Sequence, residues 1–416
     1  MEKKYFKLDT EEKIINYVRT HPILNGIFLG ETKLNVRDLA DGNLNFVYAI
    51  TSVRDPEKSV LIKQALPHLR VMKSWKLFKE RLEFEANYYE FCKILEIRSI
   101  PEFYGYDEIM CVIIMENLKD HTVLRKGLTQ GNIYQRVGND IGHFLAVMLY
   151  MTSDYHMSYK EKSEATKKFT NPHLCEMTHR AVFTNPYDPQ IFENGSRHYN
   201  PFLKDQVKSM QSDQELKAGV MAMKYGFMNK NQALIHGDFH SGSIMVNKND
   251  TRIIDPEFCF FGPMGFDIGA IIGNFFLNYA AQTVKMKDQN IRETFQSYLL
   301  KMVRDIWHVF LREFEQRWSV EADFFGTPVY RRNYFREILQ DTAGYAGCKM
   351  IRRVMGCRSL VEDLATIEDE QERAQAESLI MEIGRNLIIN RSGFENIEDL
   401  IDICRKSSPL FVKNSS

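Results

Sequence analysis

The sequence predicts an α+β protein with two lobes: a small, β-rich N-terminal lobe and a larger, mainly helical C-terminal lobe. Its 416 residues exceed the length of one ordinary domain. Strand patterns gather in the first part of the chain, whereas helical patterns fill most of the rest. With 44% hydrophobic and 26% charged residues, the chain can bury a core and remain well solvated. We expect two domains, 1–118 and 119–416.

The N-terminal lobe is expected to hold a strand hairpin, a helix and a further strand. A first helix runs to Thr20, and Thr10 is a suitable N-cap because its hydroxyl can accept a backbone N–H. A turn-forming cluster, DGNLN at 41–45, follows the first extended segment. A later helix has one apolar face at helical spacing. The expected strands are 34–39, 46–52, 60–64 and 110–115, and the later helix is 80–95.

The C-terminal lobe reads as helices around a few short strands. Residues 141–151 and 203–227 are apolar helical stretches, and the pattern after Gly269 is helical almost to the end of the chain. Short apolar runs bounded by polar turns predict strands between these helical regions. The expected strands are 233–236, 243–246 and 252–254.

Charge argues against one class of function. Lys plus Arg number 54 and Asp plus Glu number 55, so the net charge is −1. A non-specific nucleic-acid binder needs a broad positive field, which this balance does not supply. We therefore expect no nucleic-acid partner.

The sequence also predicts a cytoplasmic protein without a membrane span. The N-terminus has charges but no apolar core of a signal peptide. The most apolar stretch, 268–281, is interrupted by Asn274 and Asn278 and is too short to cross a bilayer. The seven cysteines are dispersed and form no CxxC pair, which is typical of reduced thiols rather than disulfides or zinc sites.

The strongest chemical signal is HGDFHSGS at 236–243. It follows an apolar run, and a glycine turn between short strands can project the carboxylate of Asp238 into a cleft. A carboxylate in such a position can orient a hydroxyl group and take its proton. A plain turn would explain this segment equally well if it stood alone.

A second carboxylate motif, Asp255-Pro256-Glu257, also follows a short apolar strand. Carboxylate oxygens are the ligands that Mg²⁺ takes beside phosphate groups, so Asp255 and Glu257 are candidate metal ligands. Two carboxylate turns in this order predict phosphoryl transfer, with Asp238 as the base and the second motif on the metal and phosphates.

Phosphoryl transfer also needs a cation on the phosphates, and Lys63 in the second hairpin strand is the candidate. A carboxylate on the following helix should hold this lysine. We choose Glu85, with Glu80 and Glu83 as the alternatives. Exposed helix charges would account for all three glutamates otherwise.

Two backbone segments complete the predicted nucleotide site. The 41–45 loop has one glycine and does not match GxGxxG, but its backbone N–H groups can still face phosphate. Glu116, Asn117 and Leu118 follow the last strand and read as a hinge whose backbone can bind adenine, or as a plain linker. The ATP-binding residues that we predict are Asn45, Lys63, Glu85, Glu116, Asn117, Leu118, Asp255, Pro256 and Glu257.

Taken together, these segments resemble the methylthioribose kinase family, which is related to choline and aminoglycoside kinases. The matching blocks include HGDFHSGS, DPEFCFFGPMGFDIG, DGNLNFVY, IKQALPHLRV, FTNPHLCEMT and GCKMIRR. They extend from about residue 41 to residue 353, which is most of the chain. HGD is shared by many kinases of this fold, whereas DPE combined with the paired arginines is more specific.

The resemblance implies a bilobal protein-kinase-like fold and an enzyme that uses ATP and Mg²⁺ to phosphorylate the C1 hydroxyl of 5-methylthioribose in methionine salvage. It implies that Asp238 is the base, and that Arg352 and Arg353 reach the sugar and the transferred phosphoryl group. It places Trp75 in a loop over the substrate, although packing on the lobe explains Trp75 equally well. It further implies a homodimer.

One residue departs from the wider kinase pattern. Many relatives have Asn where this chain has Ser243, and that Asn is a second metal ligand. Serine matches the methylthioribose kinase pattern and moves metal binding toward Glu257.

Two rival functions remain. Another small-molecule kinase of this fold is the first, but Arg352 and Arg353 disfavour the cationic substrates of choline and aminoglycoside kinases. A degenerate kinase that only binds a nucleotide or a partner is the second. Such chains lose the base or the metal ligand, whereas Asp238, Asp255 and Lys63 are all present.

Overall fold

The computed structural model describes residues 4–39, 45–68, 78–193, 199–320, 326–356 and 362–413. Residues 41–44 of the predicted phosphate loop at 41–45, and the predicted substrate residue Trp75, lie outside these ranges. The fold is α+β, as the sequence predicted. The chain divides into two compact units, Met1–His121 with Arg252–Cys259, and Thr122–Thr251 with Phe260–Ser416.

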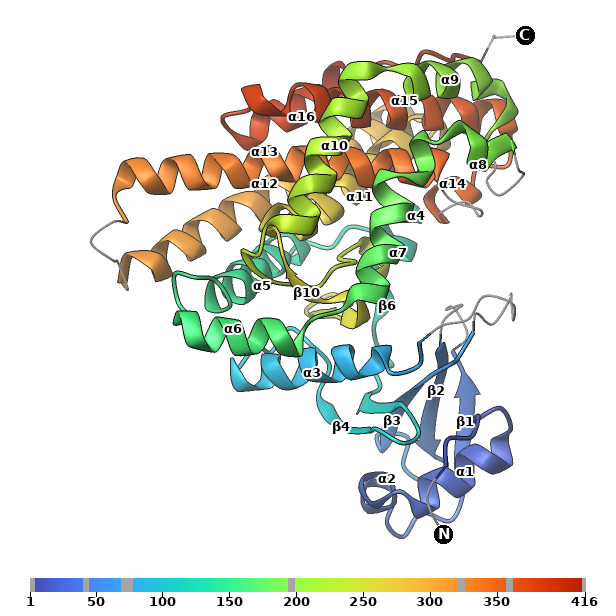
Figure 1. The fold of residues 1–416 in the computed structure, drawn as a ribbon. Coiled ribbons are helices and arrows are strands. Elements are labelled where there is room, and N and C mark those ends of the chain that lie inside the picture. Colours follow the sequence, from blue (N-terminus) through green and yellow to red (C-terminus); the bar gives the residue numbers. More distant parts are fainter. Residues whose placement is uncertain are drawn as a thin grey trace. The chain divides into compact units, whose positions relative to one another are not determined.

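The first unit is built on a five-stranded antiparallel sheet with the strand order β1-β2-β3-β5-β4, drawn mostly in blue in Figure 1. The central strand β3 pairs with β2 on one side and β5 on the other, so that Lys63 lies between Val47 and Ile113. Lys63 is therefore on an interior strand and not at a solvated edge. The strands are β1 (Leu34–Asp38), β2 (Asn45–Ser52), β3 (Ser59–Ala65), β4 (Phe103–Asp107) and β5 (Val112–Glu116).

The helices of the first unit are α1 (Glu11–Thr20), α2 (Pro22–Ile27) and α3 (Arg81–Ile94). The Thr10 side chain caps α1 by accepting the Lys13 N–H, as predicted. Side chains of α1 and α2 pack with β2, β3 and β5 in one apolar cluster that includes Tyr17, Leu24 and Ile62. The late segment 252–259 joins this unit through a hydrogen bond from Ile253 N to Ser99 O at 2.7 Å.

The second unit is mainly helical, with short strands that carry its loops. In it, β6 (Thr122–Val123) pairs with β8 (Ile244–Val246), and β10 (Phe260–Gly262) pairs with β7 (Ala233–Ile235). The strand β9 (Thr251–Ile253) leads the chain back into the first unit. The helices are α4 (Leu124–Thr129), α5 (Val137–Met151), α6 (Tyr159–Lys168), α7 (Pro172–Phe183), α8 (Pro189–Glu193), α9 (Lys204–Ser212), α10 (Gln214–Asn229), α11 (Met264–Lys285), α12 (Gln289–Val320), α13 (Pro328–Met355), α14 (Glu362–Ala365), α15 (Glu370–Ile389) and α16 (Ile397–Lys406).

Helices α11 and α13 pack closely in the middle of the second unit (Figure 1). Glycines on α11 allow this approach, because a Cβ on Gly265 would lie 2.7 Å from Asp341 Cβ and one on Gly269 would lie 2.5 Å from Thr342 O. Residues at both of these α11 positions must therefore be very small for α13 to lie so near. Within the described ranges, no helix combines the length and apolar character needed to cross a membrane.

Most predicted elements are confirmed, and several differ in their limits. The stretch 203–227 forms two helices, because Asp213 ends α9 and caps the start of α10 with its side chain. The helix expected after Gly269 begins earlier, at Met264, where Pro263 precedes the first turn. The strand expected from residue 110 begins at Val112, because Cys111 has a positive φ of 48°. The sequence reading missed the strands β4, β6 and β10.

Candidate active site

Lys63 lies between two carboxylates in the first unit. Its Nζ donates to Glu85 Oε2 at 2.7 Å and to Asp255 Oδ1 at 2.5 Å. Of the three glutamates considered from the sequence, Glu85 on α3 is the one that contacts this lysine. Glu80 pairs with the neighbouring Lys79 at 2.8 Å, and Glu83 is exposed. The structure thus brings together three of the predicted ATP-binding residues.

Burial and charge act in opposite directions in this cluster. Burial raises the pKa of Glu85 to about 7, and the adjacent Lys63 offsets only part of that rise. Burial would lower the pKa of Lys63, but Asp255 and Glu85 raise it overall. Lys63 is therefore a cation at neutral pH, with two acidic neighbours that compete for it. Such a cation is available to phosphate oxygens if one of these carboxylates turns to another partner.

Asp255 is placed by an unusual backbone turn. It has a left-handed φ of 63°, its N–H donates to the Tyr89 hydroxyl at 3.2 Å, and Pro256 starts a short 3₁₀ turn after it. Aspartate tolerates this conformation better than most residues do. The side chain of Asp255 is 46% exposed, so an oxygen of this carboxylate remains accessible.

Glu257 is held by Arg81, a buried residue at the start of α3. Arg81 Nε donates to Glu257 Oε2 at 3.1 Å, and its Nη2 donates to Asn45 Oδ1 at 2.6 Å. Its Nη1 donates to the carbonyls of Leu66 and Phe78 at 2.9 and 2.8 Å. Arg81, which the sequence reading missed, thus ties Asn45 and Glu257 together.

The predicted hinge residues lie at the end of β5. The Glu116 carboxylate accepts the Glu102 N–H at 3.0 Å, and Asn117 Nδ2 donates to Ser59 Oγ at 2.6 Å. Leu118 is buried, with 9% of its surface exposed. The side chains of Glu116 and Asn117 are therefore engaged within the first unit, and any adenine recognition here would fall to the backbone.

Asp238 lies on a tight turn in the second unit. Strand β7 ends at Ile235, and Gly237 has a φ of 82°, a conformation that glycine adopts without a steric penalty. Asp267 of α11 fixes this turn: its Oδ2 accepts the His236 N–H at 2.6 Å and its Oδ1 accepts the Gly237 N–H at 3.1 Å. Burial raises the pKa of Asp267 to about 7, although the two backbone donors act against that rise.

The carboxylate of Asp238 has two positive or polar neighbours. Lys349 Nζ of α13 lies 3.0 Å from Asp238 Oδ1, and His240 Nε2 lies 3.3 Å from Asp238 Oδ2. Burial would raise the pKa of Asp238, but Lys349, His240 and Arg352 together hold it well below its usual value. The group is therefore an ionised carboxylate at neutral pH, which is the state that a proton acceptor requires.

Arg352 and Arg353, predicted to bind substrate, lie near the end of α13 and close to this turn. The charge of Arg352 acts on Asp238, and that of Arg353 acts on His240. Nε of Arg352 is buried and has no hydrogen-bond partner among the described residues. The structure therefore gathers Asp238 and both arginines in the second unit.

Four residues around these carboxylates were not assigned from the sequence: Arg81, His240, Asp267 and Lys349. Three of them stand inside segments that the sequence analysis singled out, HGDFHSGS, GPMGFDIG and GCKMIRR. Their residue types alone predict solvated charges or turn residues. His240 is two residues from Asp238, whereas Asp267 and Lys349 reach Asp238 or its loop from segments far along the chain, so no local pattern reveals those two contacts.

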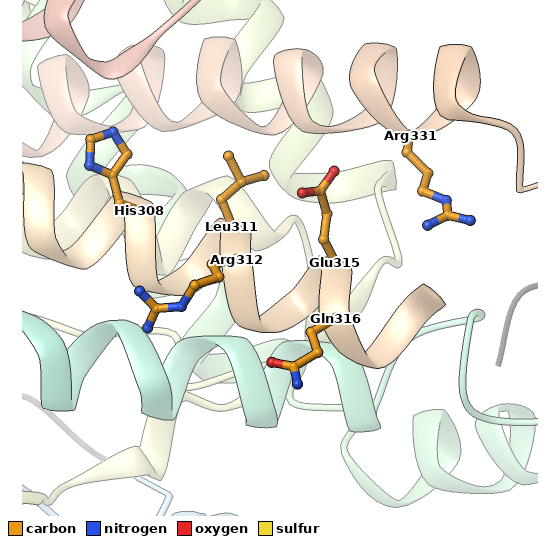
Figure 2. Close-up of a pocket in the computed structure, with 6 residues that line it drawn as sticks. All are labelled: His308, Leu311, Arg312, Glu315, Gln316 and Arg331. Carbon is orange, nitrogen blue, oxygen red and sulfur yellow. The ribbon is translucent and has the colours of Figure 1, made fainter. Parts of the chain in front are cut away.

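A separate open groove of about 490 Å³ lies on α12 and α13 of the second unit. Figure 2 shows its lining residues, His308, Leu311, Arg312, Glu315, Gln316 and Arg331. None of the predicted catalytic or binding residues lines this groove, so we do not place the reaction there.

Comparison with known proteins identifies the family. Residues 36–295 match the phosphotransferase enzyme family, APH. Methylthioribose kinase 1 of Oryza sativa subsp. japonica is 34% identical over 408 residues, covering 94% of this chain and 93% of the relative. The methylthioribose kinase of Escherichia coli O45:K1 (strain S88 / ExPEC) is 38% identical over 381 residues, covering 88% of this chain and 89% of the relative.

A solved structure supports the fold independently of close sequence similarity. The choline kinase from Cryptosporidium parvum Iowa II has 13% sequence identity and a TM-score of 0.52, with 94% of this chain and all (100%) of that chain covered. At this identity the likeness is evidence for the fold alone, and it agrees with the protein-kinase-like fold expected from the sequence motifs. The identity and coverage of the sequence relatives go further: this chain belongs to the methylthioribose kinase family, within the phosphotransferase enzyme family, and is a kinase.

Proposed function

We propose that this protein transfers the γ-phosphoryl group of ATP to the C1 hydroxyl of 5-methylthioribose, giving 5-methylthioribose 1-phosphate in methionine salvage. The family supports the substrate, because the relatives in Oryza sativa and Escherichia coli are methylthioribose kinases. The observation that carries the chemistry is the ionised carboxylate of Asp238, held by Lys349 beside Arg352. A carboxylate and an arginine in this arrangement suit a hydroxyl nucleophile and an anionic phosphoryl group.

In this reaction Asp238 orients the C1 hydroxyl and accepts its proton as the oxygen bonds to the γ-phosphorus. The bond from the γ-phosphorus to the bridging oxygen breaks, and ADP leaves with the electron pair. Arg352 and Arg353 bind the oxygens that carry the developing negative charge, because a guanidinium offers planar donors to phosphate. Most of the rate enhancement then comes from positioning and electrostatic stabilisation.

The first unit is proposed as the ATP-binding lobe. Lys63 would contact the phosphates, Glu85 would hold Lys63, and Asn45 would contact the nucleotide near the 41–44 loop. The hinge of Glu116, Asn117 and Leu118 would meet adenine through its backbone. We propose residues 1–118 as this lobe, and we add to it the segment around Asp255, Pro256 and Glu257, which the expected domain 119–416 had included.

Mg²⁺ fits the residues present. Asp255 and Glu257 offer carboxylate oxygens, and Mg²⁺ in kinases is held by one or two carboxylates together with substrate phosphates. When bound, the ion supplies positive charge to the phosphate oxygens. Lys63 already neutralises Asp255, and Arg81 already neutralises Glu257, so both carboxylates are stable without the ion.

Two further features belong to the proposal. We propose a homodimer, which light scattering of the purified protein will test against a single chain of 48.7 kDa. We also propose a cytoplasmic location. The six cysteines within the described ranges are free thiols, which supports a reducing compartment.

A coupled ADP-release assay tests the substrate. Methylthioribose, choline, kanamycin and ribose are each offered with Mg-ATP, and phosphorus NMR identifies the phosphorylated position. Turnover with methylthioribose alone, at C1, supports the proposal. Turnover with choline or kanamycin instead would contradict the proposed substrate but would agree with the assignment as a kinase. ATP binding without turnover of any of these would contradict the proposed reaction.

A further inference from the structure

The amino group of Lys349 is buried beside the proposed catalytic base. Lys349 is 5% exposed, lies on the last third of α13, and reaches the turn between β7 and β8. Its Nζ lies 3.0 Å from Asp238 Oδ1 and 4.6 Å from the centre of the Phe266 ring. A buried ammonium is costly unless an anion compensates it, and Asp238 is the anion that does so here.

The two oxygens of Asp238 are held by different residues. His240 Nδ1 accepts the Gly242 N–H at 3.0 Å, so the ring proton is on Nε2 and points to Asp238 Oδ2. Burial lowers the pKa of His240 to about 4, so at neutral pH the imidazole donates this hydrogen bond as a neutral ring. Burial lowers the pKa of Lys349 and Asp238 acts against that decrease, so the cation in contact with the carboxylate is Lys349.

Lys349 also has N–H donors that no acceptor among the described residues uses. An ammonium carries three N–H groups, and Asp238 Oδ1 is the acceptor that the described residues give it. The Phe266 ring face offers a weaker, directionless attraction. Unused donors at a buried amino group beside Asp238 suit a site that receives further oxygen atoms when a substrate binds.

The other charged groups around Asp238 come from three elements. Arg352 and Arg353 lie on α13 with Lys349, Asp267 lies on α11, and Arg125 lies on α4 near His240. Arg125 has its own partners, Asn274 at 3.2 Å and Asp363 at 3.7 Å. Lys349 is the cation of this set that contacts Asp238 directly.

We propose that Lys349 is a positioning residue for catalysis: it fixes the orientation of the Asp238 carboxylate and keeps that carboxylate ionised, so that it can accept the proton of the substrate hydroxyl. This inference rests on the proposed function, which makes Asp238 the base. It assigns to α13 a second role beside that of the paired arginines.

The test compares Lys349→Met, Lys349→Arg and a control, Lys285→Met, with the unchanged protein. Methionine keeps the length and apolar stem of lysine but removes the charge, whereas arginine keeps the charge. Lys285 is a lysine of the same unit at the far end of α11, where its Nζ donates to Thr129 O at 2.9 Å. Its loss removes the same charge without touching the Asp238 turn.

The pH profile of kcat distinguishes positioning from a merely structural role. Loss of the Lys349 charge favours the protonated form of Asp238, so the acid limb moves to higher pH in Lys349→Met. Loss of the fixed carboxylate orientation lowers kcat at neutral pH about 10²-fold. Lys349→Arg returns the acid limb toward that of the unchanged protein. Lys285→Met leaves the acid limb in place. An unmoved acid limb in Lys349→Met, with kcat unchanged, would overturn the inference.

A substrate-free readout separates this inference from the proposed function. Carbon-13 NMR of aspartate-labelled protein follows protonation of the Asp238 carboxyl, which is assigned by the loss of its signal in Asp238→Asn. The carboxyl titrates at higher pH in Lys349→Met than in the unchanged protein if Lys349 holds it ionised. The same titration in both proteins would contradict the inference even if methylthioribose is turned over. A shifted titration without turnover would contradict the proposed function alone.

Discussion

At the scale of single residues, the charged cluster around Lys63 and the one around Asp238 use charge in different ways. In the first unit Lys63 shares two carboxylates, and one of them, Glu85, has a pKa raised to about 7 by burial. In the second unit Asp238 has one direct cation, Lys349, and its pKa is lowered despite burial. The first arrangement keeps a cation ready for phosphate, and the second keeps a base ready for a proton.

Asp238→Asn tests the base directly. Asparagine has nearly the same shape but cannot accept the proton as an anion does, so kcat should fall about 10²- to 10⁴-fold. ATP binding should persist, because the proposed ATP-binding residues lie in the other unit. ADP release measures the first effect and calorimetry with ATP the second. A folded Asp238→Asn protein with full turnover would contradict the assignment of the base.

Arg81 offers a stability prediction. Arg81→Met removes the Arg81 guanidinium from the Glu257 carboxylate, whose side chain is 6% exposed, and breaking a buried pair on one side costs about 3–5 kcal/mol. Urea unfolding should show this loss. The double variant Arg81→Met with Glu257→Gln should be less destabilised than the sum of the single variants, because the unpaired charge is gone. Strict additivity would show that the pair is not coupled.

At the scale of elements, α11 and α13 carry the supports of the Asp238 turn. Asp267 on α11 holds the backbone of the turn, and Lys349 on α13 holds the side chain. The distance between these helices is set by glycines on α11, including Gly265 and Gly269. Packing at this interface therefore determines the geometry of the proposed base.

Gly269→Ala tests that dependence. The added Cβ would lie 2.5 Å from the backbone oxygen of Thr342, so the helices must separate. Overpacking of this kind costs about 1–3 kcal/mol, and the displaced α13 should lower kcat as well. Thermal unfolding and ADP release measure the two effects.

Gly26→Ala is the matched control for this substitution. Gly26 lies in the helix α2 of the first unit, and a Cβ there meets nothing within 4 Å. Alanine should stabilise this helix by about 0.4–1 kcal/mol through a smaller entropy loss on folding, with kcat unchanged. Equal changes in stability and in kcat in the two variants would show that neither property depends on the close approach of α11 and α13.

At the scale of the whole molecule, the stability of the second unit should depend on pH through Glu377 of α15. Burial raises the pKa of Glu377 to about 7, and its Oε2 has no hydrogen-bond partner among the described residues. Because the pKa in the folded protein exceeds the ordinary value of 4.5, the folded state binds a proton more tightly than the unfolded chain. The contribution of protonated Glu377 to the stability of the folded state is therefore fully present below pH 4.5. It is lost as the pH rises through about 7.

Glu377→Gln isolates this effect. Glutamine stays neutral, so the stability of Glu377→Gln relative to that of the unchanged protein should increase from about pH 5 to pH 8. Urea unfolding across this range measures it. A difference that stays constant with pH would show that Glu377 does not titrate in this window.

The sequence by itself determined the fold class, most elements and the family, because these depend on local periodicity and on contiguous motifs. HGDFHSGS, DPE and the helical pattern after Gly269 are all local signals. Local motifs also predicted that Asp238, Asp255 and Lys63 carry the chemistry.

Only the tertiary structure decided which side chains surround those residues. The sequence favoured Glu85 but left Glu80 and Glu83 open, and the contact of Glu85 with Lys63 distinguishes it from them. Lys349 lies 111 residues after Asp238, and Glu257 lies 176 residues after Arg81, so neither pair has a local signal. The physical reason is that a buried charge is stabilised by whichever opposite charge the packing brings near, and that packing is set by α11, α13 and the sheet rather than by neighbouring sequence.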